Sequence, residues 1–206
     1  LVFDLDPAPD VKWPAVAEAA HEVRERLQKL GLRSFVKSTG GKGLHVVVPL
    51  RRDPERFRWE QAKAFCKALA QAMEADSPSR YLSLSTKAKR RGKIYVDYLR
   101  NARGATSIAP YSTRARTGAP ISVPLGWDEL ASFDPAVPLT LRTLGEHLGH
   151  AWRDPWRELP AVRQRLSSKV LRLVSAYGHP SPLGSGDKKR LSGSTKRRRR
   201  RAQAPA

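Results

Sequence analysis

Apolar positions along the chain follow two spacings, which predict short strands separated by amphipathic helices. Short apolar runs predict strands at residues 1–6, 32–37, 44–49, 94–99 and 106–110. Apolar residues at helical spacing predict helices at residues 13–30, 59–74 and 159–177. Residues 111–138 are rich in Pro and Gly, which indicates irregular structure, and residues from 181 onward lack a core-forming pattern. This order of elements predicts an α+β fold in which a mixed α/β sheet is flanked by helices.

The composition is typical of one sizeable core with a polyanionic partner. The chain has 206 residues, of which 40% are hydrophobic, and no run approaches the roughly 18 apolar residues of a membrane helix. The net charge of +20 favours nucleic acid as the partner, and an anionic membrane second. Residues 186–201 hold nine of the basic residues against the single acidic Asp187. The lone Cys66 excludes a disulfide framework and a zinc cluster, and we expect an intracellular, reducing compartment.

Two aspartates, Asp4 and Asp6, follow the apolar start of the chain. Their spacing of two places both side chains on one face of a strand. Carboxylates this close repel each other unless a positive charge lies between them, and Mg²⁺ or Mn²⁺ prefers such oxygen ligands. The alternative is a strand end at which an aspartate caps the turn before Pro7. These residues alone do not choose between the two.

A glycine-rich turn at residues 38–43 is the second candidate for chemistry. Successive backbone N–H groups in such a turn can form an anion-binding nest. Thr39 adds a hydroxyl, Lys42 a point charge and His45 an imidazole, which together suit a triphosphate. The alternative is a tight hairpin with a solvated lysine and a core histidine whose hydrogen bonds are satisfied. The GxxxxGK[ST] pattern of a Walker A loop is not present.

Charged residues near the fourth predicted strand form the third candidate. Asp97 lies within an apolar strand, where an unpaired carboxylate is expensive. Its partner is either a buried arginine or a metal shared with Asp4 and Asp6. Arg90, in the basic run before the strand, is part of either a solvated turn or a phosphate-binding surface, and Arg114 is placed to clamp a phosphate.

These motifs, in this order, resemble the polymerase domain of bacterial ligase D, which belongs to the archaeo-eukaryotic primase superfamily and acts in non-homologous end joining. The motifs lie at residues 4–7, 39–45, 95–98, 109–112 and 124–130. The resemblance implies a primase-polymerase-like catalytic core over residues 1–148. It also implies a C-terminal helical segment of the same domain at 149–180, and a disordered basic tail at 181–206.

The resemblance also implies roles for individual residues. It implies that two metal ions, Mn²⁺ or Mg²⁺, are held by three catalytic carboxylates, namely Asp4, Asp6 and Asp97. It implies nucleotide contacts from Thr39, Lys42, His45, Arg90, Arg114 and Asn101, with Arg100 beside the last of these near the sugar.

The implied reaction adds nucleotides, with ribonucleotides preferred, to the 3′-hydroxyl of DNA ends during double-strand-break repair. The implied partners are DNA ends, nucleoside triphosphates, Ku and the ligase domain of the same system, and not a membrane. The implied location is the bacterial cytoplasm, in association with the nucleoid.

One departure from the family pattern leaves two alternatives open. Family members carry a long stretch before the first catalytic strand, which supplies an aromatic stacking residue and the lysines that grip a 5′-phosphate. We therefore expect this chain to be a fragment of a longer product, and a non-catalytic nucleic-acid-binding fragment is the first alternative. The second is a phosphohydrolase of the haloacid dehalogenase type, which needs Thr or Val where this chain has Ala8.

Overall fold

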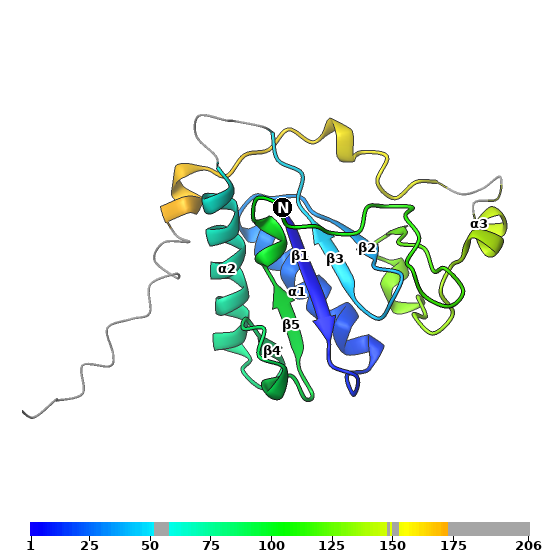
Figure 1. Cartoon of the computed structure of the whole chain (residues 1–206). Helices are drawn as coiled ribbons and strands as arrows, with labels where there is room; N and C mark the ends of the chain where they lie inside the picture. The colour runs from blue at the N-terminus through cyan, green and yellow to red at the C-terminus, as the bar shows by residue number, and fades with distance from the viewer. Residues whose placement is uncertain (52–57, 148, 150–152, 173–206) are drawn as a thin grey trace, which may run out of the picture.

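A six-stranded sheet with helices packed on one face forms the centre of the molecule (Figure 1). The structure, a computed structural model, describes residues 1–51, 58–147, 149 and 153–172. Its strands are β1 (Val2–Pro7), β2 (Phe35–Ser38), β3 (Leu44–Val47), β4 (Tyr81–Leu82), β5 (Ile94–Asp97) and β6 (Pro124–Leu125). Its α-helices are α1 (Trp13–Lys29), α2 (Trp59–Asp76) and α3 (Leu141–His147). Short 3₁₀ turns lie at Lys87–Lys89, Leu99–Asn101, Glu129–Ala131 and Leu159–Ala161.

The sheet is mixed, and its most central strands are β1 and β3. The strand order is β4-β5-β1-β3-β2-β6. Only the β4–β5 pair is parallel; the other neighbouring pairs are antiparallel. The predicted α+β fold with a mixed sheet flanked by helices is therefore confirmed. Because the first strand of the chain lies between β5 and β3, residues distant in sequence meet on either side of it.

The two faces of β1 differ in polarity because successive side chains of a strand point to opposite faces. Phe3 and Leu5 are fully buried in the core formed with α1 and α2. Phe3 meets Phe65 of α2 edge to face, with ring centroids 6.4 Å apart. Asp4 and Asp6 project from the other face, which lies toward the viewer in Figure 1, with α1 behind the sheet. Helix packing thus buries one face of the sheet and leaves the acidic face without a helix among the described residues. We call this the open face, although Asp97 and His45 on it are only 6% and 3% exposed.

The helix predicted at residues 159–177 is largely wrong. The described part contains one 3₁₀ turn, extended backbone and a short helical turn at 168–172, while residues 173–177 lie outside the described residues. Gln164 explains the extended course, because its side-chain amide donates to the carbonyls of Arg33 and Pro49. Its own carbonyl accepts the Arg51 amide. These bonds tie the segment across the chain next to β2 and β3. The described residues 153–167 of the predicted C-terminal helical segment at 149–180 therefore form no α-helix, while residues 150–152 and 173–180 lie outside the described residues.

Strand prediction failed where the strands are very short. No strand forms at residues 106–110, whereas β4 and β6, each two residues long, were not expected. A two-residue strand carries no apolar period, so only its tertiary pairing reveals it. The basic tail predicted at 181–206 lies outside the described residues. None of the helices that the structure describes is long and apolar enough to cross a membrane.

Gly43 gives a test of how closely the β2–β3 turn meets β1. A Cβ at this position would lie 2.6 Å from the carbonyl oxygen of Leu5, and that backbone atom cannot yield easily. We expect Gly43→Ala to lower the free energy of unfolding by about 1–3 kcal/mol, as measured by urea denaturation. Gly145→Ala is the control, because a Cβ added there would have no heavy atom of the described residues within 4 Å. Equal stability of the two variants would contradict the close contact.

Candidate functional site

A row of four polar side chains crosses the open face of the sheet. The strand register pairs Asp97 of β5 with Asp4 of β1, Asp4 with His45 of β3, and His45 with Lys37 of β2. Directly opposed residues of antiparallel strands project to the same face. Asp97, Asp4, His45 and Lys37 therefore form one continuous line, which we call the polar row. Asp6 lies on the same face, two residues further along β1.

Arg100 holds the acidic end of the polar row together. Its Nε lies 3.2 Å from an oxygen of Asp4 and 3.2 Å from an oxygen of Asp97. The other oxygen of Asp97 accepts the amide of Leu99 at 2.7 Å and the hydroxyl of Tyr95 at 3.3 Å. An arginine partner for Asp97 is therefore present and is shared with Asp4, but it is 40% exposed and not the buried arginine that was considered.

His45 and Arg100 keep Asp4 ionised. Burial by itself raises the pKa of Asp4, but the hydrogen bond and charge of His45, followed by Arg100, hold that pKa below its ordinary value. The Nε2 atom of His45 lies 3.4 Å from an Asp4 oxygen. The Nδ1 atom of His45 is buried and has no hydrogen-bond partner among the described residues. A buried polar atom without a partner is unusual and points to a missing ligand or water.

Asp6 pairs with a different arginine, Arg90. Its side chain is 50% exposed, against 15% for Asp4, and it accepts a hydrogen bond from Arg90 at 2.7 Å. The Arg90 guanidinium also lies over the Tyr95 ring, 4.5 Å from its centroid. Thus all three predicted metal ligands share one face, but each is paired with an arginine.

The donor set nevertheless fits a hard divalent cation. Among the residues that the structure describes, no three acidic, histidine or cysteine side chains converge tightly enough to form a metal site as they stand. However, Asp4 and Asp97 each place an oxygen 3.2 Å from the same arginine nitrogen, so one cation already bridges them. Carboxylate oxygens are the ligands that Mg²⁺ and Mn²⁺ prefer.

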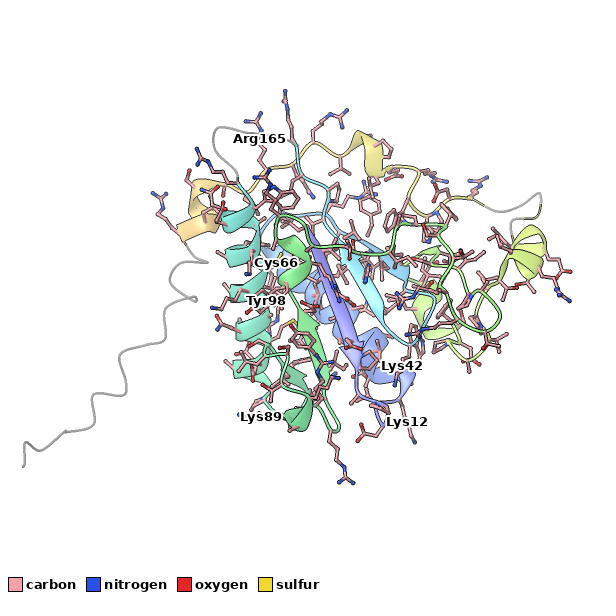
Figure 2. The ribbon with its side chains drawn as sticks, in the orientation of Figure 1. Lys12, Lys42, Cys66, Lys89, Tyr98 and Arg165 are labelled. Atoms are coloured by element: carbon pink, nitrogen blue, oxygen red, sulfur yellow. The ribbon has the colours of Figure 1, made fainter. Side chains whose placement is uncertain are left out.

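The glycine turn is closed by its own threonine and carries an exposed lysine. The hydroxyl of Thr39 donates to the carbonyl of Gly43 at 3.1 Å. Lys42 is exposed on this turn (Figure 2). The turn enters β3 directly, and His45 lies two residues beyond Gly43. Thr39 and Lys42 therefore lie on the turn that leads into β3, and His45 of β3 is itself part of the polar row.

Two arginines from a distant segment lie against this turn. Gly40 has a φ of +66°, and a Cβ there would lie 2.9 Å from the Cγ of Arg114. At Gly41 a Cβ would lie 3.1 Å from a guanidinium nitrogen of Arg116. The two glycines thus leave room for the side chains of Arg114 and Arg116 beside the turn. Arg114 was predicted from sequence, while Arg116 was missed because nothing in its local pattern separates it from a solvated arginine.

Comparison with known proteins assigns the family. The family described as "LigD, primase-polymerase domain" matches residues 1–156. This chain belongs to the LigD primase-polymerase domain family. The resemblance inferred from the motifs of the sequence is confirmed.

Relatives from three bacteria support this assignment. The chain is 44% identical over 172 residues to the "Multifunctional non-homologous end joining protein LigD" of Pseudomonas aeruginosa, which covers 83% of this chain and 20% of the relative. It is 41% identical over 137 residues to a LigD of Mycobacterium tuberculosis, which covers 66% of this chain and 17% of the relative. A "Bifunctional non-homologous end joining protein LigD" of Bacillus subtilis is 33% identical over 138 residues, covering 66% and 22%. The chain thus spans about a fifth of each relative.

A solved structure supports the fold. It is the "Polymerase Domain from Mycobacterium tuberculosis Ligase D in complex with DNA", which matches with a TM-score of 0.70 and 36% sequence identity. The match covers 78% of this chain and 54% of that chain. The LigD primase-polymerase fold is therefore shared over the matched part.

Lys37 is a second site residue, besides Arg116, that sequence reasoning missed. Only 2% of its surface is exposed, and its Nζ donates to the hydroxyl of Ser122 at 2.6 Å. Burial lowers the pKa of Lys37 to about 8, with the charge of Asp4 opposing this shift and that of Arg114 adding to it. The available signal was a lysine inside an apolar strand, in line with the histidine of the next strand.

Asn101, which is predicted to contact the nucleotide, has its side chain buried against the start of β1. Its side chain is only 4% exposed, and its amide donates to the carbonyls of Val2 and Tyr98. Its side-chain oxygen accepts the Val2 amide at 2.8 Å. Both donor hydrogens are therefore used within the protein, and the side chain fixes the start of β1. The described contacts of Asn101 are thus structural, and its nucleotide contact stays a prediction.

Asn101→Ala separates these two roles. Because the substitution leaves buried backbone groups of Val2 without partners, we expect a loss of about 2 kcal/mol in the free energy of unfolding, measured by urea denaturation. The nucleotide KM of the fraction that remains folded should stay unchanged. A raised nucleotide KM of Asn101→Ala, with unchanged stability, would instead support a nucleotide contact by Asn101.

The lowered pKa of Lys37 predicts a pH dependence of stability. Lysine in the unfolded chain titrates near 10.4, so between about pH 8 and 10.4 the unfolded state binds more protons and the folded state gains stability as pH rises. Lys37→Met lacks this dependence. We expect the wild-type protein to gain stability relative to Lys37→Met between pH 7 and pH 10, by about 3 kcal/mol at most. Urea denaturation at both values measures the difference, and a pH-independent difference would contradict the buried ammonium.

Proposed function

We propose that this chain carries the catalytic face of a nucleotidyltransferase that adds nucleotides, preferentially ribonucleotides, to the 3′-hydroxyl of DNA ends during double-strand-break repair. The observation that carries this proposal is the register that sets Asp97 directly opposite Asp4 on the open face of the sheet. The LigD primase-polymerase family and the DNA complex of the M. tuberculosis polymerase domain support it.

In this proposal Asp4, Asp6 and Asp97 hold two divalent metal ions, Mn²⁺ or Mg²⁺. When bound, such ions supply Lewis-acid activation of a hydroxyl and neutralisation of phosphate charge. Arg90 and Arg100, which pair with these carboxylates in the described structure, then become available to phosphate oxygens. Guanidinium groups suit that role because their planar fork of donors matches phosphate geometry.

The protein's own contribution is positioning and charge. The 3′-oxygen of the primer attacks the α-phosphorus of the nucleotide, and the bond to the leaving pyrophosphate breaks as the new phosphodiester bond forms. Lys42 on the glycine turn and Arg114 beside it lie where they can hold the triphosphate, and the Thr39 hydroxyl keeps the turn closed. Catalysis of this type depends mainly on alignment and electrostatic stabilisation.

The remaining assignments belong to the same proposal. The partners are DNA ends, nucleoside triphosphates, Ku and the ligase domain of the same system. The location is the bacterial cytoplasm, in association with the nucleoid. The LigD name of the relatives, which includes non-homologous end joining, supports this setting. Membership in the LigD primase-polymerase family replaces the phosphohydrolase alternative.

A non-catalytic DNA-binding fragment is the second candidate. One observation favours it: each of the three carboxylates is paired with an arginine. The net charge of +20 supports DNA affinity under either proposal. The two differ in whether the carboxylates are needed.

Asp97→Asn decides between them. We expect the variant to lose template-dependent extension with Mn²⁺ by about 100-fold or more, because one metal ligand is removed. Binding of Mn²⁺, followed by electron paramagnetic resonance, should weaken in parallel. DNA affinity, measured by fluorescence anisotropy, should not fall.

Glu25→Gln is the matched control, because it removes the same charge from an exposed position on α1. It should leave extension, Mn²⁺ binding and DNA affinity unchanged. Extension that continues at the wild-type rate in Asp97→Asn would refute the metal assignment. DNA binding without extension in the wild-type chain would favour the non-catalytic fragment.

A further inference from the structure

Lys37 is a buried ammonium that forms no ion pair with any residue that the structure describes. Its Nζ contacts two neutral oxygens, the Ser122 hydroxyl at 2.6 Å and the Ser38 carbonyl at 3.4 Å. An ammonium carries three donor hydrogens, and only one of these contacts is short. Removing such a charge from water without a charged partner is expensive. An anion bound nearby would offset that cost.

The surroundings of Lys37 point to an anion rather than to a structural role alone. On one side lies His45, its direct partner across the β2–β3 pair, whose buried Nδ1 has no hydrogen-bond partner among the described residues. On another side lies Arg114, close enough for its charge to act on Lys37. The glycine turn starts immediately after β2. A buried ammonium and a second cation therefore lie at the same end of the polar row.

The hydrogen bonds of Lys37 also join the two segments that border this end. The Ser122 hydroxyl, which accepts from Lys37, donates to the Ser38 carbonyl at 2.7 Å. Ser122 pairs through its backbone with Tyr111 and Ser112, next to the segment that carries Arg114. Lys37 thus lies beneath both the glycine turn and the arginine segment.

We propose that the buried charge of Lys37 is a determinant of polyphosphate binding at this end of the polar row, acting on the triphosphate of the incoming nucleotide through the site that Lys42 and Arg114 border. Lys37 is a positioning residue that acts through its charge, which it supplies next to the two bordering segments. A charge in a poorly hydrated interior acts more strongly and over a longer range than one in water. The choice of triphosphate as ligand rests on the proposed function, whereas the anion site itself does not.

The test uses the 206-residue chain and inorganic tripolyphosphate, which has no base, no sugar and no reaction to undergo. Thermal stability is followed as tripolyphosphate is added without metal, and the saturating shift gives an apparent Kd. We expect Lys37→Met to weaken this Kd by about tenfold or more, and Lys37→Gln to do the same if the first variant folds poorly. Lys67→Met, at an exposed position on α2, is the matched control and should bind as the wild type does.

Ser122→Ala distinguishes charge from structure. This variant removes the hydrogen bond that Lys37 donates but keeps its ammonium, so we expect the tripolyphosphate Kd to change by less than about threefold. If Ser122→Ala and Lys37→Met weaken binding equally, Lys37 acts only as a structural link and the proposal is overturned. It is also overturned if the wild type shows no saturable shift, or if Lys37→Met binds as tightly as the wild type.

Nucleotide addition is measured separately on the same proteins. If the wild type binds tripolyphosphate but shows no nucleotide addition, the proposed function is contradicted and the anion site remains supported. Normal extension with an unchanged nucleotide KM in Lys37→Met would overturn the role of Lys37 and leave the proposed function in place. A raised nucleotide KM with a smaller effect on kcat is the expected result.

Discussion

The antiparallel register on both sides of β1 is the constraint from which the candidate site follows. It sets Asp4 between Asp97 and His45, all on one face. A slip of one residue would move Asp4 to the core face, where Phe3 and Leu5 are now fully buried, and an uncompensated carboxylate there is strongly destabilising. The apolar packing against the helices therefore fixes the position of the acidic groups, although the packed residues lie on the opposite face of the sheet.

The charges on this face of the sheet are balanced at one end of the polar row and unbalanced at the other. Arg100 bridges two carboxylates and Arg90 pairs with the third, so the repulsion between the acids is compensated within the chain. At the other end of the polar row, Lys37 has only neutral partners among the described residues. The row therefore runs from compensated negative charge to uncompensated positive charge, an arrangement that suits cations at one end and a polyphosphate at the other.

Periodicity predicted the long elements well, because each buries one apolar face regardless of its partner. The prediction of helices near residues 13–30 and 59–74, and of the strands around the glycine turn, is confirmed by α1, α2, β2 and β3. The helix expected at 159–177 failed because Gln164 bonds to backbone groups more than a hundred residues away. Such competition is invisible to a local pattern, as is the pairing that creates the two-residue strands β4 and β6.

The sequence by itself determined the chemistry that is available: the motifs with Asp4, Asp6 and Asp97, the glycine turn, and through them the family. Local order and residue type are enough for this because motifs are read along the chain. Only the tertiary structure decided which groups meet, since strand register brings together residues far apart in sequence. It placed Lys37 in the polar row, gave Asn101 to the backbone of β1, and set Arg116 beside Gly41, because burial and hydrogen-bond partners depend on the folded neighbours of a residue.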